Sequence, residues 1–125
     1  MKKIRIAVIG CGNIANSAHI PAYKKNSEVN VTYFCDILPE RAQQAVKAYG
    51  GGKAVTDYRQ LLDSGEVDAV SICTPNHLHA EIAIAFLRAG KDVLCEKPAA
   101  RTYAEALEMQ RVARETGRLL LIGVC

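Results

Sequence analysis

The sequence contains no tryptophan, and aromatic residues make up only 6% of its 125 positions. This scarcity argues against a platform on which the bases of a single-stranded nucleic acid would stack. Dense clusters of one charge are also missing, because 16 basic and 13 acidic residues are scattered along the chain. The densest basic run, Lys2-Lys3-Ile4-Arg5, is too short for a nucleic-acid footprint, so we expect no nucleic-acid partner.

Long hydrophobic runs are absent as well. The longest candidates are residues 80–87, which include Glu81, and residues 119–125, and both fall far short of the roughly 20 residues that span a membrane. The lysines near Met1 are compatible with the start of a signal peptide, but the apolar segment after them ends at Gly10. We therefore expect a cytoplasmic protein with no membrane partner.

Cysteine pairs at metal-binding spacing do not occur. The chain has cysteines at positions 11, 35, 73, 95 and 125, and none of them forms a C-x-x-C motif. Three of them end apolar segments, so we expect small, buried, reduced side chains rather than disulfides. His77 and His79 have no neighbouring carboxylate or cysteine that would complete a ligand set, so no metal site is expected.

The composition is that of a folded domain. Half of the residues are apolar and 23% are charged, which excludes a disordered or collagen-like chain. The length fits one domain over residues 1–125, and a chain of this size can bury a core without disulfides.

Short β-branched runs alternate with helical stretches along the whole chain. The pattern predicts strands at residues 4–9, 29–35, 53–55, 67–73, 92–95 and 118–124. It predicts helices at residues 13–25 (restarting at Pro21), 39–49, 58–62, 76–89 and 102–116. The strands are almost wholly apolar, which is typical of sheets covered on both faces. We therefore predict an α/β fold, with a doubly wound parallel sheet of about six strands and helices on both faces.

Sheets of this kind bind ligands beyond the carboxyl ends of their strands. The first strand is followed by Gly10-Cys11-Gly12-Asn13-Ile14-Ala15, which has G-x-G-x-x-A spacing. Gly10 permits a tight turn, Gly12 lets a pyrophosphate approach the backbone, and Ala15 allows close packing of helix on strand. The alternative is a purely structural turn, but the loop lies between a strand and a helix, which favours the binding role.

Asp36 follows the second strand, 21 residues beyond Ala15. An acid at this position accepts hydrogen bonds from the adenosine ribose and repels a 2′-phosphate, which favours NAD over NADP. The alternative is a solvated turn aspartate before Pro39. Arg41 is close enough in sequence to cover the adenine or to reach a phosphate, so NADP stays open as the less favoured cofactor.

The fourth strand is followed by Thr74-Pro75-Asn76-His77-Leu78-His79. Thr74 and Asn76 offer a hydroxyl and an amide at the edge of the sheet, although Asn76 is equally suited to cap the next helix. We expect His77 on the surface and His79 facing the cleft.

The fifth strand is followed by Glu96-Lys97-Pro98. A Glu-Lys pair is usually solvated surface, but this one directly follows a buried strand at the edge where ligands bind. Glu96 is suited to bind ribose hydroxyls, and Lys97 is suited to hold a substrate hydroxyl or to transfer a proton.

Taken together, these residues resemble the N-terminal domain of the glucose–fructose oxidoreductase / inositol 2-dehydrogenase / rhizopine-catabolism (Gfo/Idh/MocA) family, from Ile4 to Val124. The most specific stretches are Thr74-Pro75-Asn76-x-x-His79 and Ala89-Gly90-Lys91-x-Val93-Leu94-Cys95-Glu96-Lys97-Pro98. The resemblance implies the NAD(P)-binding Rossmann domain of an oxidoreductase. Such an enzyme transfers a hydride between a nicotinamide cofactor and a sugar, cyclitol or related polyol.

The resemblance also implies roles for individual residues. In the family, the pyrophosphate is held by the residues that match Gly10, Gly12, Asn13 and Ile14. The adenosine end is met by Asp36 and Arg41. The nicotinamide side is lined by Thr74, Asn76, His79 and Glu96. The lysine that matches Lys97 lies near the hydride-transfer position and is the catalytic residue, binding or activating the substrate hydroxyl.

Members of the family continue into a second, α+β domain that supplies the substrate pocket and most oligomer contacts. We therefore expect a longer, homo-oligomeric parent protein, and a chain that by itself binds NAD(H) without turning over a polyol. Two alternatives stay open. One is a standalone nucleotide-binding or sensing module without catalysis. The other is a Rossmann domain for another adenosine ligand such as coenzyme A, against which Asp36 speaks.

Overall fold

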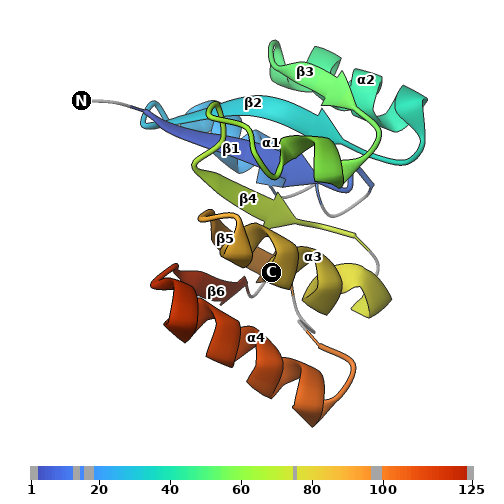
Figure 1. The fold of residues 1–125 in the computed structure, drawn as a ribbon. Helices are drawn as coiled ribbons and strands as arrows, with labels where there is room; N and C mark the ends of the chain where they lie inside the picture. Colours follow the sequence, from blue (N-terminus) through green and yellow to red (C-terminus); the bar gives the residue numbers. More distant parts are fainter. Residues whose placement is uncertain (1–2, 13–14, 16–18, 75, 97–99, 124–125) are drawn as a thin grey trace.

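Six parallel strands form one sheet in the order β3-β2-β1-β4-β5-β6. The computed structural model describes residues 3–12, 15, 19–74, 76–96 and 100–123. The strands are β1 (Ile4–Ile9), β2 (Val29–Cys35), β3 (Lys53–Val55), β4 (Ala69–Ile72), β5 (Asp92–Glu96) and β6 (Leu120–Gly123). Their carboxyl ends all lie at the same edge of the sheet (Figure 1). The strand order reverses between β1 and β4, which confirms the predicted doubly wound sheet.

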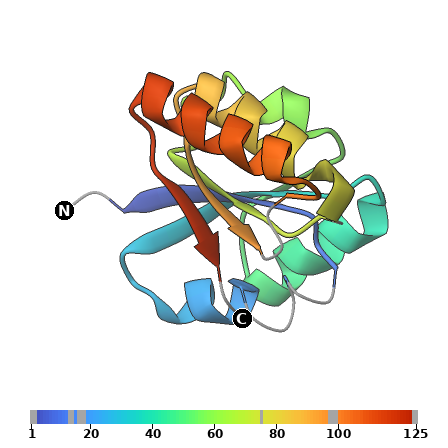
Figure 2. The same ribbon diagram turned by 90° about the horizontal axis from the view of Figure 1, so that it is seen from below.

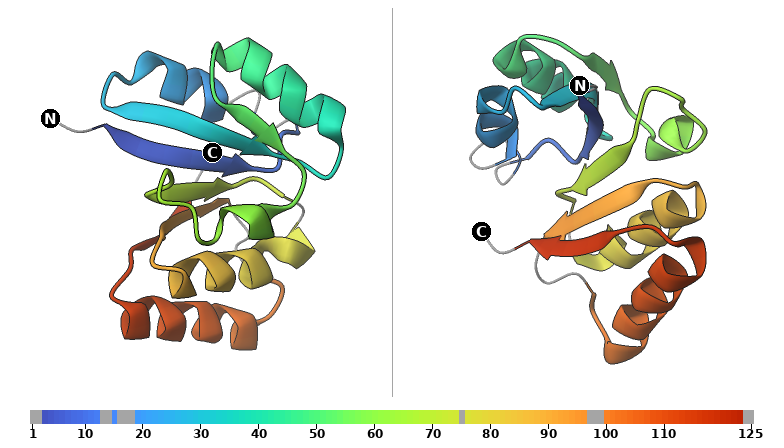
Figure 3. Two further views of the ribbon diagram at one scale, coloured as in Figure 1. Left: turned by 45° about the horizontal axis from the view of Figure 1, so that its top comes forward. Right: turned by 90° about the vertical axis from the view of Figure 1, so that its left-hand side faces the viewer.

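Helices cover both faces of this sheet, as Figures 2 and 3 show. One face carries α1 (Ile20–Lys25) and α2 (Pro39–Tyr49). The other carries η2 (Tyr58–Leu61), α3 (His79–Arg88) and α4 (Tyr103–Thr116), with the short turn η3 (Asn76–Leu78) directly before α3. None of the helices in the described ranges is long and apolar enough to cross a membrane.

Alternate residues of the strands point to opposite faces, so each face has its own core. On β1, Ala7 and Ile9 belong to the core under α3 and α4, which centres on the fully buried Phe86. Val8, between them, belongs to the core under α1 and α2, which centres on Phe34. Two buried faces explain why the strand sequences are almost continuously apolar.

Local sequence signals set the ends of two long helices. Pro39 stands in the first turn of α2, and Gly50 ends the helix in the left-handed region with φ +91°. Thr102 caps α4, because its hydroxyl accepts a hydrogen bond from the Glu105 amide at 3.1 Å. These observations confirm the predicted bounds of α2 and explain why α4 begins directly after Thr102.

Some predicted bounds differ from the structure. The helix predicted at residues 76–89 begins as the 3₁₀ turn η3 and becomes α-helical only at His79, a tightening that is common at helix ends. Strand β4 begins at Ala69, two residues later than predicted. At the preceding Asp68, the backbone amide still donates to the Arg5 carbonyl at 2.8 Å, but the Arg5 amide donates to the Asp68 carboxylate at 2.9 Å. Of the helix predicted at residues 13–25, α1 is described, whereas positions 13, 14 and 16–18 lie outside the described residues.

Candidate functional site

A cavity of about 860 Å³ lies at the carboxyl ends of β1, β2, β3 and β4. This volume is in the range of small-molecule sites, and the position includes the point where the strand order reverses. The site residues predicted from sequence that line it are Gly10, Gly12, Asp36, Arg41 and Thr74. The fold therefore brings together residues that lie more than sixty positions apart in the chain.

Gly10 is required by the backbone itself. Its φ is +92°, a conformation that residues with a side chain rarely adopt. A Cβ atom at this position would lie 2.8 Å from the carbonyl carbon of Cys73, because the turn after β1 packs directly on the end of β4. The Gly10 amide also donates to the Cys35 carbonyl at 2.7 Å, which ties the turn to β2.

Gly12 differs from Gly10. A Cβ atom there would meet only Nη1 of Arg41, at 3.9 Å, within the part of the chain that the structure describes. Among the described residues, packing does not exclude a side chain at this position as it does at Gly10.

Asp36 is buried, with only 8% of its surface exposed, so it is not a solvated turn residue. Its Oδ2 accepts a hydrogen bond from the Cys11 amide at 2.9 Å, and its Oδ1 accepts one from the Leu38 amide at 2.8 Å. The carboxylate thus joins the glycine turn to the end of β2. Each carboxylate oxygen can accept more than one hydrogen bond, so Asp36 keeps acceptor capacity toward the cavity that it lines.

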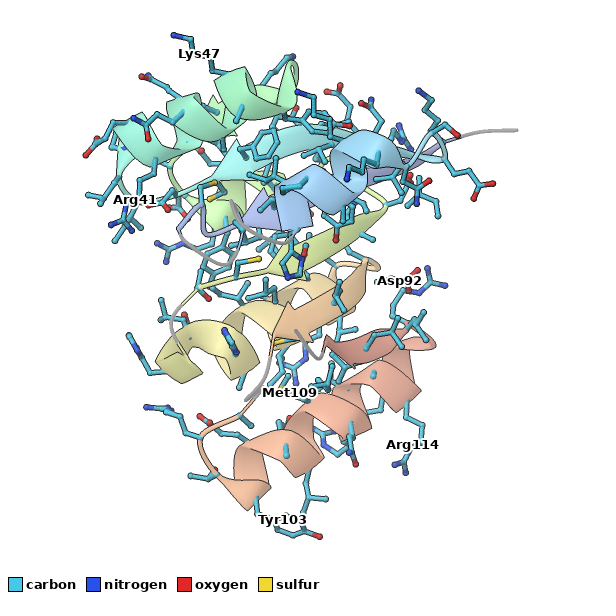
Figure 4. All side chains as sticks on the ribbon, turned by 180° about the vertical axis from the view of Figure 1, so that it is seen from behind. Arg41, Lys47, Asp92, Tyr103, Met109 and Arg114 are labelled. Carbon is cyan, nitrogen blue, oxygen red and sulfur yellow. The ribbon has the colours of Figure 1, made fainter. Side chains whose placement is uncertain are left out.

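Two arginines border the cavity, and they differ in whether a carboxylate pairs with them. Arg59 is neutralised by a two-pronged pair with Asp57, at 3.0 and 3.2 Å. Arg41 forms no ion pair with any carboxylate in the described ranges, and its guanidinium lies over Gly12. Figure 4 shows Arg41 at the start of α2, beside the turn that follows β1. A cation in the first turn of a helix is opposed by the helix dipole, so an anion in the cavity would stabilise it.

Thr74 lies at the end of β4 and lines the cavity. Its Oγ1 is buried and has no hydrogen-bond partner among the residues that the structure describes. Burying a hydroxyl without a partner is unfavourable unless a ligand or water supplies one. Thr74 therefore offers an unsatisfied donor and acceptor at the edge of the cavity.

The two histidines differ from each other. His77 is exposed, as predicted, and borders the cavity. His79 was expected to face the cleft, but its side chain is 99% buried and is not part of the cavity lining. The ring instead turns back toward the sheet, where Nε2 lies 2.5 Å from the carbonyl oxygen of Thr74. This hydrogen bond is the physical reason for the difference.

The structure leaves some predicted site residues without a described side chain. Asn13, Ile14 and Lys97 lie outside the described residues. The backbones of Asn76 and Glu96 are described, in η3 and at the end of β5, which is the edge where the cavity opens. Their roles stay predictions from sequence.

Sequence reasoning missed the segment that follows β3. The cavity is also lined by Thr56, Asp57, Tyr58 and Arg59. The Tyr58 hydroxyl donates to a Glu81 oxygen at 3.4 Å, and burial together with the Glu81 charge raises the pKa of Tyr58. No short motif marks these residues. The signal was their position after a strand, because every strand of a parallel sheet ends at the same edge.

Buried thiols surround the glycine turn. Burial, with a smaller contribution from the charge of Asp36, raises the pKa of Cys11 to about 12 and that of Cys35 to about 12. The Cys11 thiol donates to the Cys35 carbonyl at 3.5 Å. Cys11, Cys35 and Cys95 are buried, as expected, and Cys73 is partly buried. The described part of the chain has no cluster of side chains suited to hold a metal ion.

Comparisons with known proteins agree with this geometry. Residues 4–124 match the family described as "Oxidoreductase family, NAD-binding Rossmann fold" (GFO_IDH_MocA). D-glucoside 3-dehydrogenase of Escherichia coli (strain K12) is 35% identical over 117 residues, which is 94% of this chain and 33% of that protein. Inositol 2-dehydrogenase of Salmonella paratyphi B is 34% identical over 122 residues, which is 96% of this chain and 36% of that protein.

Solved structures show the same similarity. A 3-ketoreductase from Actinomadura kijaniata, crystallised with NADP and TDP-benzene, superimposes with a TM-score of 0.92 and 38% identity. The match covers 98% of this chain and 37% of that one. The chain thus spans about a third of the length of the relatives that it matches. It belongs to the Gfo/Idh/MocA family of oxidoreductases, as the NAD(P)-binding Rossmann part of that family's fold.

Proposed function

We propose that the cavity is the dinucleotide site of an NAD(P)-dependent oxidoreductase. In the whole protein, a hydride would pass between the nicotinamide and a carbinol of a sugar, cyclitol or related polyol. The observation that carries the proposal is the meeting of an open glycine turn, a buried carboxylate and an unsatisfied hydroxyl in one cavity. The names of the relatives, which include a glucoside dehydrogenase and an inositol dehydrogenase, support this substrate class.

The residues present fit a dinucleotide. Among the described residues, only Arg41 lies near the position of a Cβ atom on Gly12, and its charge has no carboxylate partner there, so a diphosphate could approach this turn. Asp36 has acceptor capacity for ribose hydroxyls at the end of β2. The buried Thr74 hydroxyl would gain a partner from the ligand at the end of β4. A dinucleotide would supply phosphate oxygens for the Arg41 charge, ribose hydroxyls for the Asp36 carboxylate and a hydrogen-bond partner for the Thr74 hydroxyl.

The roles of the chain's own residues follow from the order of the strands. Asp36 and Arg41, at the end of β2, would hold the adenosine half, and the turn after β1 would hold the diphosphate. Thr74, Asn76 and Glu96, at the ends of β4 and β5, would hold the nicotinamide half. When bound, the nicotinamide would supply the hydride chemistry, and the protein would orient it. Lys97 would hold or deprotonate the substrate hydroxyl.

We propose further that NAD is preferred over NADP. A 2′-phosphate on the adenosine ribose would come close to the buried carboxylate of Asp36, and like charges repel strongly where water is excluded. Arg41 works in the opposite direction, because its unpaired guanidinium is within reach of the same half of the ligand. The carboxylate has the larger effect, since it is fixed by two backbone hydrogen bonds whereas Arg41 is exposed.

Replacing Asp36 with serine tests this preference. Asp36→Ser removes the charge and leaves one hydroxyl acceptor for the Cys11 amide, so the ratio of NAD to NADP affinity is expected to fall by about tenfold. Dissociation constants for both dinucleotides would be measured by calorimetry. The control is Asp57→Asn, which changes a carboxylate on the same cavity that is already neutralised by Arg59. An unchanged ratio in Asp36→Ser would mean that Asp36 does not select the cofactor.

We also place the protein in the cytoplasm. The spacing of the five cysteines in the sequence, which contains no C-x-x-C motif and suggests no disulfide framework, supports a reducing compartment.

A further inference from the structure

We infer that His79 is a positioning residue of the dinucleotide site. It holds the turn after β4 through the carbonyl oxygen of Thr74, and it does not touch the cofactor. The inference rests on the proposed function for its purpose, but the hydrogen bond itself is a property of the chain alone. It also replaces the expectation that His79 lines the nicotinamide side.

Burial separates His79 from the ligand. Its side chain is 1% exposed, whereas its neighbours His77 and Leu78 border the cavity, as does Ile82 one helical turn further on. A dinucleotide in the cavity would therefore meet these three side chains and not the His79 ring. A role for His79 in binding must act through another residue.

The hydrogen bond identifies that residue. Nε2 of His79 lies 2.5 Å from the Thr74 carbonyl oxygen, and a carbonyl only accepts, so Nε2 carries the proton. Thr74 is at the carboxyl end of β4, and His79 is the first residue of α3. The hydrogen bond therefore links the residues that follow β4 to the start of α3.

Thr74 is held from its other side by the glycine turn. A Cβ atom on Gly10 would lie 2.9 Å from the Thr74 amide nitrogen, which shows how tightly the two turns pack. The glycine turn restrains the amide side of Thr74, and His79 restrains the carbonyl side. The Thr74 hydroxyl, buried and without a described partner, is fixed between these two restraints at the cavity wall. A preorganised donor of this kind binds its ligand without the entropic cost of being ordered first.

The first test needs no variant. In the wild-type chain with ¹⁵N-labelled histidine, the Nε2–H signal of His79 should be present at neutral pH and protected from exchange with water, with or without NADH. A ring that carries its proton only on Nδ1 would overturn the inference, because such a ring cannot donate to the Thr74 carbonyl.

A matched set of variants tests the consequence for binding. Glutamine places an amide nitrogen as many bonds from the backbone as Nε2, so His79→Gln should bind NADH within about threefold of wild type. His79→Asn has a shorter reach and His79→Leu has no donor, so both should bind NADH about tenfold more weakly. ADP, which would lie over β1 and β2, should bind all four chains within about threefold. Thermal unfolding identifies the temperature at which every variant is folded, and binding is measured below it.

A double-mutant cycle shows whether His79 acts through Thr74. Thr74→Val removes the hydroxyl and keeps the shape, so it should weaken NADH binding by about tenfold. Adding His79→Asn to Thr74→Val should then cost little more. Independent, multiplying losses would overturn the inference, as would wild-type affinity in His79→Leu or a loss in His79→Gln as large as that in His79→Leu. A wild-type chain that binds neither NADH nor NADPH overturns the proposed function instead, and with it the purpose given to His79.

Discussion

Gly10 and Gly12 lie in one turn but differ in their backbone conformation and in the space around them. Gly10 has a left-handed backbone and no space for a Cβ atom, because the end of β4 lies 2.8 Å from where that atom would be. Gly12 has neither restriction in the described structure. Gly10 is therefore required by the fold, whereas our proposal is that Gly12 is required for the approach of the ligand.

This distinction predicts opposite outcomes for the same substitution. Gly12→Ala should unfold at nearly the wild-type temperature and lose dinucleotide affinity by about tenfold or more, because the methyl group occupies the approach of the diphosphate. Gly10→Ala should lower the unfolding free energy by more than about 1 kcal/mol, since the backbone is strained and the methyl group clashes. Calorimetric melting and NADH titration of both variants measure the two effects. A Gly12→Ala chain with full affinity would contradict the assignment of the turn.

The thiols beside the turn should be inert. A pKa of about 12 leaves roughly one Cys11 thiol in ten thousand ionised at pH 8, and the thiolate is the reactive form. Cys35 has a similarly raised pKa and is equally buried. Iodoacetamide should therefore leave both unmodified in the native chain and modify both in urea, as read by peptide mass spectrometry. Rapid modification of either residue without denaturant would show that the turn opens to solvent.

At the scale of single elements, α4 has the most completely specified start. The Thr102 hydroxyl accepts the Glu105 amide at 3.1 Å, and a Glu105 oxygen accepts the Arg101 amide at 2.8 Å. Thr102→Ala should lower the unfolding free energy by about 1 kcal/mol, the usual loss for an N-cap. Urea unfolding measures this loss of unfolding free energy, with Thr116→Ala at the other end of α4 as a comparison. No change in Thr102→Ala would mean that tertiary packing alone fixes the start of the helix.

The charge of Glu105 makes this element sensitive to acid. Hydrogen bonds from Arg101 lower the pKa of Glu105 below its value in an unfolded chain, which is about 4.3. A lowered pKa stabilises the fold above the unfolded value, and this stabilisation is lost as the pH falls through the folded value. Glu105→Gln should therefore melt below wild type at pH 7 and match it in acid. A difference between the two chains that persists unchanged in strong acid would contradict this cause.

Sequence patterns located these elements well and their edges less well. Apolar runs and glycine or proline stops predicted all six strands and the bounds of α2, because these signals are local. The hydrogen bond from the Arg5 amide to the Asp68 carboxylate, just before β4, joins residues that lie 63 positions apart, and no local pattern contains it. The same holds for His79, whose orientation depends on a carbonyl oxygen of the strand before it.

At the scale of the whole molecule, the packing of the sheet and its helices positions the turns that form the site. The core under α3 and α4 includes Ile9 and Ile72, the last residues of β1 and β4, and so fixes the turns that bear Gly10 and Thr74. Family motifs predicted those turns, since their residues are contiguous in sequence. The part of the cavity lining that follows β3 was not predicted, because only the assembled sheet brings Tyr58 and Arg41 to the same cavity.

The core itself should dominate stability. Phe86 is fully buried under α3, so Phe86→Ala should lower the unfolding free energy by about 3–5 kcal/mol. Tyr103 is 79% exposed on α4, and Figure 4 shows it directed away from the sheet, so Tyr103→Ala should change it by less than about 0.5 kcal/mol. Urea unfolding of the two variants measures the contrast. Equal losses would mean that the helices are not packed as described.

The most direct test of the account is a titration of the 125-residue chain with NADH, followed by fluorescence and calorimetry, beside Gly12→Ala. The account predicts saturable binding of one NADH per chain, displaced by NAD and lost in Gly12→Ala although that variant stays folded. Absence of binding to the folded wild-type chain, or equal binding by Gly12→Ala, would contradict the assignment of this cavity as the dinucleotide site.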